Sequence, residues 1–266
     1  MTKAVAARFS ASAGTYAGHA AVQEAVAEHL ISVLEEAPLP PVLGAILEIG
    51  CGTGLLTRLI RRRYPSAWLC AVDVAERMTM AAACTQPPHC GLAYVVADIR
   101  RFAARRRFGL VVSSSSLHWV RPLDAALSDA AGLLAPEGVL AASLMVEGTL
   151  GELHEARRRV APGKTPAVTL PTVADVEAAV QRSGLDILEM RQESVRALYP
   201  TAKEFLGSIH RQGLTGGPVS SSGVPLTRGE LARLTREYER AYRQDEQGVV
   251  ATYEVVYVTA ARRPTR

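Results

Sequence analysis

The stretch that decides the fold is Ala45-Ile46-Leu47-Glu48-Ile49-Gly50-Cys51-Gly52-Thr53-Gly54. An apolar run that carries one carboxylate leads directly into a glycine-rich turn, and residues 55–63 then follow as a helix candidate. Glycine has no Cβ, so its backbone can turn tightly and approach a ligand closely. The helix that follows offers free N–H groups at its start. Strand, turn and helix in this order predict the opening unit of a nucleotide-binding α/β sheet.

A second apolar run, residues 67–72, ends at Asp73. A carboxylate at the tip of the second strand is placed to bind the ribose hydroxyls of a nucleoside. The glycine spacing then separates two classes of cofactor. Dinucleotide sites usually read G-x-G-x-x-G, whereas this turn reads G-x-G-x-G and is preceded by Glu48, which suits an ammonium group better than a pyrophosphate. These residues favour a cofactor with a nucleoside and an amino acid.

Glu48–Gly54 resembles motif I of the class I S-adenosylmethionine (SAM) methyltransferases. Asp73–Met78 resembles the D-x-S-x-x-M stretch of that class, with Ala75 in place of serine, and 134–138 is similar to its L-x-P-x-G element. Asp98 and Ile99 resemble the adenine clamp. The resemblance implies that SAM is the cofactor and that its binding residues are Glu48, Gly50, Cys51, Gly52, Gly54, Asp73, Val74, Met78, Asp98, Ile99 and Ser114.

The patterns along the chain predict an α/β fold, a mostly parallel Rossmann-like sheet with antiparallel last strands. The expected parallel strands are residues 45–49, 68–72, 92–96, 110–113 and 139–146, and the antiparallel ones are 185–198 and 249–261. Residues 1–18 are expected to be irregular and 20–36 helical. Helices are also predicted at 78–84, 123–134, 173–183, 202–211 and 227–242, the last with a Thr227–Glu230 capping box. Residues 213–223 form a predicted loop.

These elements suggest four segments. Residues 1–42 are a helical lid segment, 43–199 the SAM-binding α/β core, 200–245 a helical insertion over the substrate side, and 246–266 the final strand of the core sheet.

The outer segments resemble one family within this class, the malonyl-acyl-carrier-protein O-methyltransferases of biotin synthesis (the BioC family). The similar stretches are Arg8-Phe9-Ser10 with Tyr16, Ser113–Trp119, Gly148–His154, Glu204–Gly213, Tyr238-Glu239-Arg240 and Ala251-Thr252-Tyr253. Three positions depart from the family pattern: His118 stands where glutamine is usual, Leu214-Thr215 replaces Ala-Thr, and His210 stands where some members have arginine. The resemblance implies methyl transfer from SAM to the free carboxylate of a malonyl thioester, on acyl-carrier protein or CoA.

A carboxylate is already ionised at pH 7, so such a reaction needs orientation and exclusion of water more than a strong base. A cation near the carboxylate would select malonyl over a neutral acyl group. Arg211 is the first candidate for this cation and His210 the second, while Tyr16 and His118 are expected to orient the acceptor or close the site. His118 as general base is the rival interpretation, and it applies if the acceptor is a hydroxyl or an amine.

Two other functions remain open from the residues: a small-molecule O- or N-methyltransferase of another pathway, and a SAM-binding partner protein without turnover. The glycine spacing disfavours a dehydrogenase.

Length and composition limit the possible domain size, location and metal content. With 266 residues and 48% hydrophobic content, the chain can build one sizeable core. It has no apolar run long enough for a membrane span and no secretory signal at its N-terminus. Its four cysteines have neither C-x-x-C nor metal-ligand spacing, so we expect free thiols, no metal site and a cytoplasmic location.

The net charge of +4 is mild, and three short arginine runs carry much of it: 61–63, 105–107 and 157–159. They are expected to be solvated surface, or a docking face for an acidic partner such as a carrier protein. Because no aromatic stacking platform accompanies them, nucleic acid is not expected as a partner. A monomer or weak dimer is the expected state.

Overall fold

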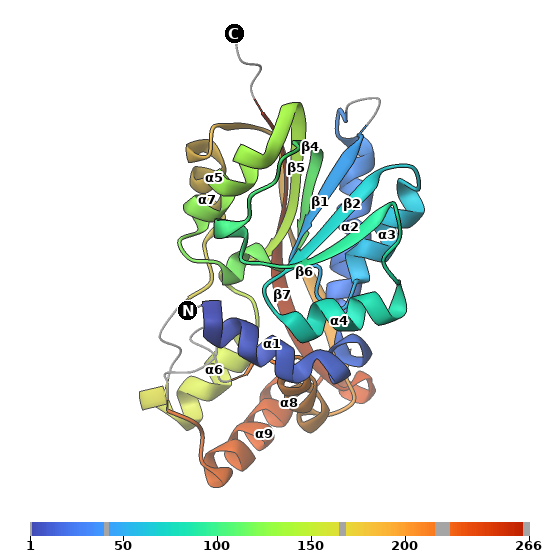
Figure 1. Cartoon of the computed structure of the whole chain (residues 1–266). Coiled ribbons are helices and arrows are strands. Elements are labelled where there is room, and N and C mark those ends of the chain that lie inside the picture. Colours follow the sequence, from blue (N-terminus) through green and yellow to red (C-terminus); the bar gives the residue numbers. More distant parts are fainter. Residues whose placement is uncertain (1, 40–42, 165–168, 216–223, 263–266) are drawn as a thin grey trace.

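The structure is a computed structural model that describes residues 2–39, 43–164, 169–215 and 224–262. Its described strands form one seven-stranded sheet in the order β3-β2-β1-β4-β5-β7-β6 (Figure 1). The strands are β1 Ala45–Ile49, β2 Trp68–Asp73, β3 Leu92–Val96, β4 Phe108–Ser114, β5 Leu134–Met145, β6 Leu185–Tyr199 and β7 Val249–Arg262. The first five run parallel, and β7 is antiparallel to both β5 and β6. The mostly parallel sheet with antiparallel last strands is therefore confirmed.

Helices cover both faces of this sheet. The described α-helices are α1 Thr2–Tyr16, α2 Ala21–Glu36, α3 Leu55–Arg63, α4 Glu76–Thr85, α5 Leu123–Leu133, α6 Gly151–Val160, α7 Val173–Arg182, α8 Ala202–Arg211 and α9 Arg228–Tyr242. Side chains of α2, α3, α8 and α9 belong to one core cluster, and those of α5 and α7 belong to another. Because the central strands are buried on both sides, their sequences are apolar runs rather than alternating ones.

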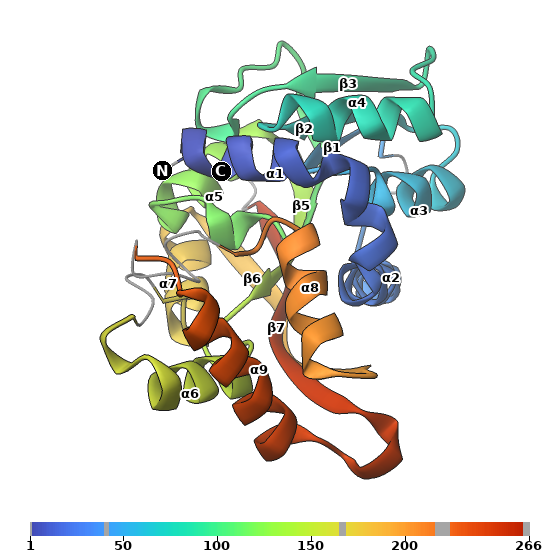
Figure 2. The same ribbon diagram turned by 90° about the horizontal axis from the view of Figure 1, so that it is seen from below.

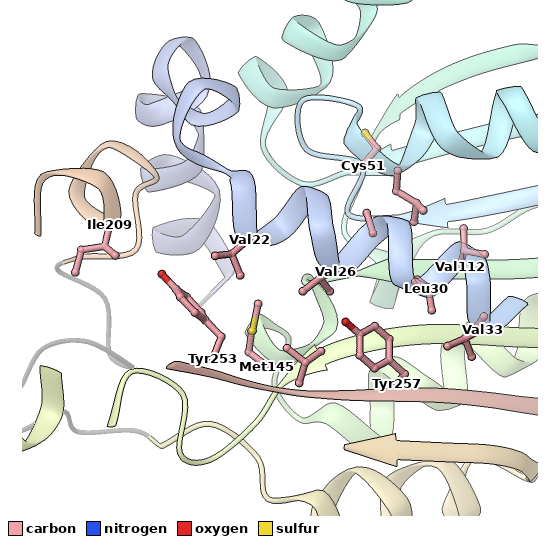
Figure 3. Close-up of a cluster of buried hydrophobic side chains, with 14 of the residues drawn as sticks. Val22, Val26, Leu30, Val33, Cys51, Val112, Met145, Ile209, Tyr253 and Tyr257 are labelled. Atoms are coloured by element: carbon pink, nitrogen blue, oxygen red, sulfur yellow. The ribbon is translucent and has the colours of Figure 1, made fainter. Parts of the chain in front are cut away.

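Helix α2 holds the N-terminal segment against the sheet. Figure 3 shows Val22, Val26 and Leu30 facing Met145 and Tyr257, which come from β5 and β7. Val26 and Leu30 are completely buried. Apolar residues at this helical spacing make one continuous face, so α2 cannot leave the sheet without exposing it.

Residues 1–18 were expected to be irregular, and this expectation is wrong. Helix α1 runs from Thr2 to Tyr16 and passes into a 3₁₀ turn at Ala17–His19. The stretch is rich in alanine, which has the highest helix propensity. Phe9 and Tyr16 also pack on Met78, and this tertiary contact fixes the helix across the sheet, between α4 and α8 (Figure 2).

The start of β5 differs from the prediction. Strand β5 starts at Leu134 instead of 139, because Leu134 pairs with Phe108 before a register shift. The L-x-P-x-G element at 134–138 forms an irregular part of this strand, with Glu137 at φ 59°. The capping box at the start of α9 is confirmed: Thr227 accepts from the Glu230 N–H, and Glu230 accepts from the Thr227 N–H.

The C-terminal insertion meets α1 directly. The backbone at Gly213, after α8, lies so close to α1 that an added Cβ would be 2.8 Å from Oγ of Ser12. The predicted loop 213–223 lies outside the described residues from 216 onward. In the described part of the chain, no helix is both long and apolar enough to cross a bilayer.

Candidate active site

A cavity lies where the glycine turn faces the carboxyl ends of β1, β2 and β4; we call it the glycine-turn cavity. It has two adjoining lobes of about 630 and 330 Å³, which share Tyr16, Gly50, Gly52, Ser114 and Ser115. Most residues predicted to bind the cofactor line one lobe or the other: Glu48, Gly50, Cys51, Gly52, Asp73, Val74, Met78 and Ser114.

The glycine turn is shaped by close approach and by the second strand. The N–H of Gly52 donates to Oδ2 of Asp73 over 2.9 Å, and the N–H of Ala75 donates to Oδ1 over 2.7 Å. Burial raises the pKa of Asp73, although these N–H donors lower it. A carboxylate has about four acceptor positions, so Asp73 retains acceptor capacity for ligand hydroxyls.

Glu48 lines the smaller lobe. Its side chain is buried, and its Oε2 accepts from the Thr57 hydroxyl over 2.6 Å. Burial raises its pKa to about 8, while the Thr57 contact lowers it and Asp73 raises it further. A buried carboxyl group with a raised pKa gains most from a ligand that brings a positive charge.

Three buried polar atoms in the cavity walls have no hydrogen-bond partner among the described residues. They are Oε1 of Gln23, Oγ1 of Thr53 and Oγ of Ser115. Buried polar groups in folded proteins are almost always paired, so these atoms indicate a polar ligand. SAM fits this set: its ammonium matches Glu48 and the Gln23 oxygen, its carboxylate matches hydroxyl donors, and its ribose matches Asp73.

A second cavity of about 770 Å³ adjoins the first; we call it the aromatic cavity. The two share Phe9, Tyr16, Gln23, Ser115 and Trp119. The Phe9 ring makes edge contacts with Trp119 and Tyr16, at centroid distances of 5.6 and 6.2 Å. This shared wall is where a group could pass from a molecule in one cavity to a molecule in the other. Burial raises the pKa of Tyr16, so its hydroxyl is protonated at pH 7.

The aromatic cavity carries a cation and no carboxylate among its described lining residues. Arg157 lines it from α6, one turn beyond Leu153 and His154. Burial lowers the pKa of Arg157, but an arginine is still charged at pH 7. Burial and the neighbouring Arg157 and Arg158 lower the pKa of His154. The electrostatics of the two cavities are opposite: carboxylates in the first, a guanidinium in the second.

His118 lies in the wall of the aromatic cavity and is 4% exposed. Its Nδ1 accepts from the backbone N–H of Met145 over 3.2 Å. Burial, followed by the charge of Arg121, lowers its pKa to about 3. The imidazole is therefore neutral at pH 7.

Arg211 and His210 lie outside both cavities. They line a separate surface hollow with Arg8 and Thr15. The Arg211 Nε–H donates to Nε2 of His19 over 2.6 Å, and His210 contacts Thr215 over 2.9 Å. The α8 residue that reaches the aromatic cavity is Ile209.

The adenine clamp residues are also absent from the described cavity walls. Asp98 pairs with Arg100 over 2.6 Å, which lowers its pKa, and Ile99 is buried in the core. Gly54 caps α3 at φ 87°, close to Ala82. Its contribution is to the shape of the turn.

Sequence reasoning missed Arg157 because it stands inside an arginine run. Leu150, Leu153, His154 and Arg157 follow i, i+3, i+4, i+7 spacing, which places them on one helix face. This spacing could have identified Arg157 from the sequence. No group of three or more His, Cys, Asp or Glu among the described residues could hold a metal ion.

Comparison with known proteins agrees with this arrangement. Residues 46–138 match the "Methyltransferase domain" family model. Among solved structures, the YcgJ protein of Bacillus subtilis has a TM-score of 0.63 at 12% identity, covering 90% of this chain and 100% of that one. A Haemonchus contortus phosphoethanolamine N-methyltransferase 2 in complex with SAM has a TM-score of 0.55 at 14% identity, covering 90% and 53%. Both show the class I methyltransferase fold.

Relatives with known names indicate the family to which the chain belongs within this fold. A malonyl-[acyl-carrier protein] O-methyltransferase of Geobacter sulfurreducens is 32% identical over 96% of this chain and 96% of its own length. This similarity spans far more of the chain than residues 46–138, which match the general methyltransferase domain. The chain belongs to the malonyl-[acyl-carrier protein] O-methyltransferase family.

Proposed function

We propose that this chain transfers a methyl group from SAM to the free carboxylate of a malonyl thioester carried by acyl-carrier protein. The observation that carries the proposal is the charge distribution across two adjoining cavities. Glu48 and Asp73 suit the ammonium and ribose of SAM, while Arg157 suits an anionic acceptor. Family membership supports the same substrate.

In this reaction the residues of the chain align the two reactants and exclude water. Phe9, Tyr16 and Trp119 lie between the two cavities and exclude water from the reacting groups. Arg157 holds one end of the acceptor carboxylate. When bound, SAM supplies the electrophilic methyl group. Alignment of two bound reactants in this way can contribute roughly 7–11 kcal/mol to catalysis.

The role first given to Arg211 is assigned to Arg157 in this proposal. Arg157 lines the aromatic cavity, whereas Arg211 faces the surface hollow beside α1. Selection of malonyl over a neutral acyl group requires a cation that reaches the acyl chain. Arg211 and Arg8 are better placed for contact with a carrier protein at the surface.

We also propose that residues 1–42 and 200–245 cover the α/β core on its substrate side. Monomer or weak dimer is the proposed state, because residues of a single chain line both cavities. A cytoplasmic location is proposed from the four cysteines, all of which are free thiols.

A methyl-transfer assay tests the function. Purified protein, SAM and malonyl-acyl-carrier protein are incubated, and the carrier is examined by mass spectrometry. The proposal predicts a gain of one methyl group on the malonyl form and none on acetyl-carrier protein, which lacks the free carboxylate. An unmodified malonyl carrier, with SAM still bound by the enzyme, would contradict it.

A second candidate is a methyltransferase acting on a hydroxyl or an amine, which needs a base. The observation in its favour is His154, an imidazole that burial keeps neutral in the aromatic cavity. Methylation of a hydroxyacyl thioester, lost in His154→Ala, would support it.

A further inference from the structure

The two nitrogens of the His118 ring have different surroundings. Nδ1 is directed at the N–H of Met145, 3.2 Å away. A backbone N–H can only donate, so Nδ1 must be the nitrogen without a proton. In a neutral imidazole the proton is then on Nε2. The side chain lines the aromatic cavity, and Nε2 has no hydrogen-bond partner among the described residues.

We infer that His118 is a neutral hydrogen-bond donor, which orients the acceptor through its Nε2–H and does not act as a general base. The inference rests on the proposed function for the identity of the acceptor. The Nδ1 lone pair of His118 accepts from the Met145 N–H, and Nε2 already carries a proton. Neither ring nitrogen can therefore take a proton from a substrate in the cavity.

The charged and titratable groups around the ring agree with this role. Arg121, two residues beyond η3 (Leu117–Trp119), disfavours an imidazolium. Tyr16 from α1, His154 and Arg157 from α6 and Tyr253 from β7 line the same cavity. None of these groups is a carboxylate, so the described lining residues offer an imidazolium no anion until an acceptor binds.

A donor is what a carboxylate acceptor requires. Methylation of a carboxylate oxygen forms one C–O bond and breaks one C–S bond, whose electron pair stays on sulfur; no proton is released. Hydrogen bonds from Nε2–H and from Arg157 can therefore hold the oxygen that does not react while the other attacks. An alcohol or amine acceptor would need an acceptor nitrogen at this place instead.

The first experiment is NMR on the full-length protein with ¹⁵N-labelled histidine. Two-bond ¹H–¹⁵N spectra should show His118 with a proton on Nε2 and a bare Nδ1, unchanged between about pH 5.5 and 8.5. The resonance is identified by its loss in His118→Gln. A proton on Nδ1, or an imidazolium forming in this range, would overturn the inference whatever the acceptor is.

The second experiment compares variants with malonyl-acyl-carrier protein as substrate. His118→Ala should lower kcat/KM roughly ten- to a hundredfold, the usual effect of one hydrogen bond to a charged group. His118→Gln replaces the donor with an amide N–H and should recover most of the loss, with SAM binding unchanged in both variants. Because His118 is buried and accepts from Met145, His118→Ala should also lower thermal stability, whereas the glutamine oxygen can replace that acceptor. A glutamine variant as impaired as the alanine variant, yet folded and able to bind SAM, would overturn the donor role.

His89 provides a matched control. Its Nδ1 also accepts from a backbone N–H, that of Gly91 over 3.0 Å, but the side chain is exposed and lines neither cavity. His89→Ala and His89→Gln should leave the kinetics unchanged. If the wild-type protein did not methylate the malonyl carrier at all, the proposed function would fail, while the NMR spectra would still decide the state of His118.

Discussion

A Cβ placed on Gly50 would lie 1.9 Å from Oγ of Ser116. The glycine turn and the loop after β4 are thus in direct contact, and this contact brings the two walls of the glycine-turn cavity together. A Cβ placed on Gly52, two residues further along, would meet no atom within 4 Å. The two glycines therefore serve different purposes, although the sequence motif treats them alike.

Substitution by alanine should separate these purposes. Gly50→Ala combines a clash with a backbone φ of 76° and should lower the free energy of unfolding by about 2–4 kcal/mol. Gly52→Ala should cost only about 1–2 kcal/mol from its φ of 53°, but its methyl group enters the cavity and should weaken SAM binding.

Urea unfolding and calorimetric titration with S-adenosylhomocysteine measure the two effects. Gly132→Ala is the control, because Gly132 lies in α5 with open space around it. It should stabilise the protein slightly through helix propensity. Equal losses of stability in Gly50→Ala and Gly52→Ala would refute the distinction.

Glu48 should make cofactor binding depend on pH. Its pKa of about 8 lies above its ordinary value of 4.5, so the carboxyl group of the cofactor-free protein is mostly protonated at pH 7. The ammonium of SAM favours the ionised form. Affinity for SAM should therefore rise as pH increases from about 6 to 8, by at most about tenfold per pH unit.

The same pKa has a consequence for stability. Because the folded-state pKa is raised, protonated Glu48 stabilises the cofactor-free fold at low pH, and this contribution is lost as pH rises through about 8. Glu48→Gln should bind SAM more weakly and remove both pH dependences. A titration series in which wild type and Glu48→Gln show the same pH slope would contradict this account.

Arg157 should decide selectivity for the acceptor. Arg157→Ala removes the described cation of the aromatic cavity and should raise KM for malonyl-acyl-carrier protein roughly tenfold to a hundredfold, with SAM affinity unchanged. Arg158→Ala is the matched control, since Arg158 is the next residue of α6 and is exposed. Steady-state kinetics with both variants make the comparison.

Arg211→Ala belongs in the same series because Arg211 was the first candidate for the carboxylate partner. Because Arg211 lies outside the aromatic cavity, Arg211→Ala should leave selectivity for the malonyl group unchanged. At most, it should weaken binding of the carrier protein in a salt-dependent way. A larger loss in Arg211→Ala than in Arg157→Ala would return the role to Arg211.

Tyr16 lines both lobes of the glycine-turn cavity and the aromatic cavity. Tyr16→Phe keeps the ring that separates the two cavities and removes only the hydroxyl, so it should retain much more activity than Tyr16→Ala. Single-turnover rates measure this directly. Equal losses in the two variants would show that the hydroxyl, and not the ring, is the functional group.

Strands β1 to β4 were predictable because they are short, largely apolar runs bounded by turn residues. β1 and β3 begin and end where the sequence indicates, and the capping box at Thr227 fixes the start of α9. Residues on the cofactor side were also predictable, since Gly50 and Gly52 follow β1, Asp73 ends β2, and parallel strand ends meet at one edge of the sheet.

The acceptor side was harder to predict because it depends on which way helical side chains face. Ile209 and Arg211 are two residues apart, and a helix turns roughly 200° over that distance, so one reaches the aromatic cavity and the other the surface. Only the packing of α1 against α8 decides between them. The same reason hid Arg157 among neighbouring arginines.

We propose that the methyl acceptor is an ionised carboxylate. This proposal is tested most directly by comparing malonyl-acyl-carrier protein with malonamyl-acyl-carrier protein, whose terminal amide has the same shape and no charge. With SAM saturating, we expect one methyl ester on the malonyl carrier and no methylation of the amide. Methylation of both carriers at similar rates, or of neither while SAM binds normally, would contradict it.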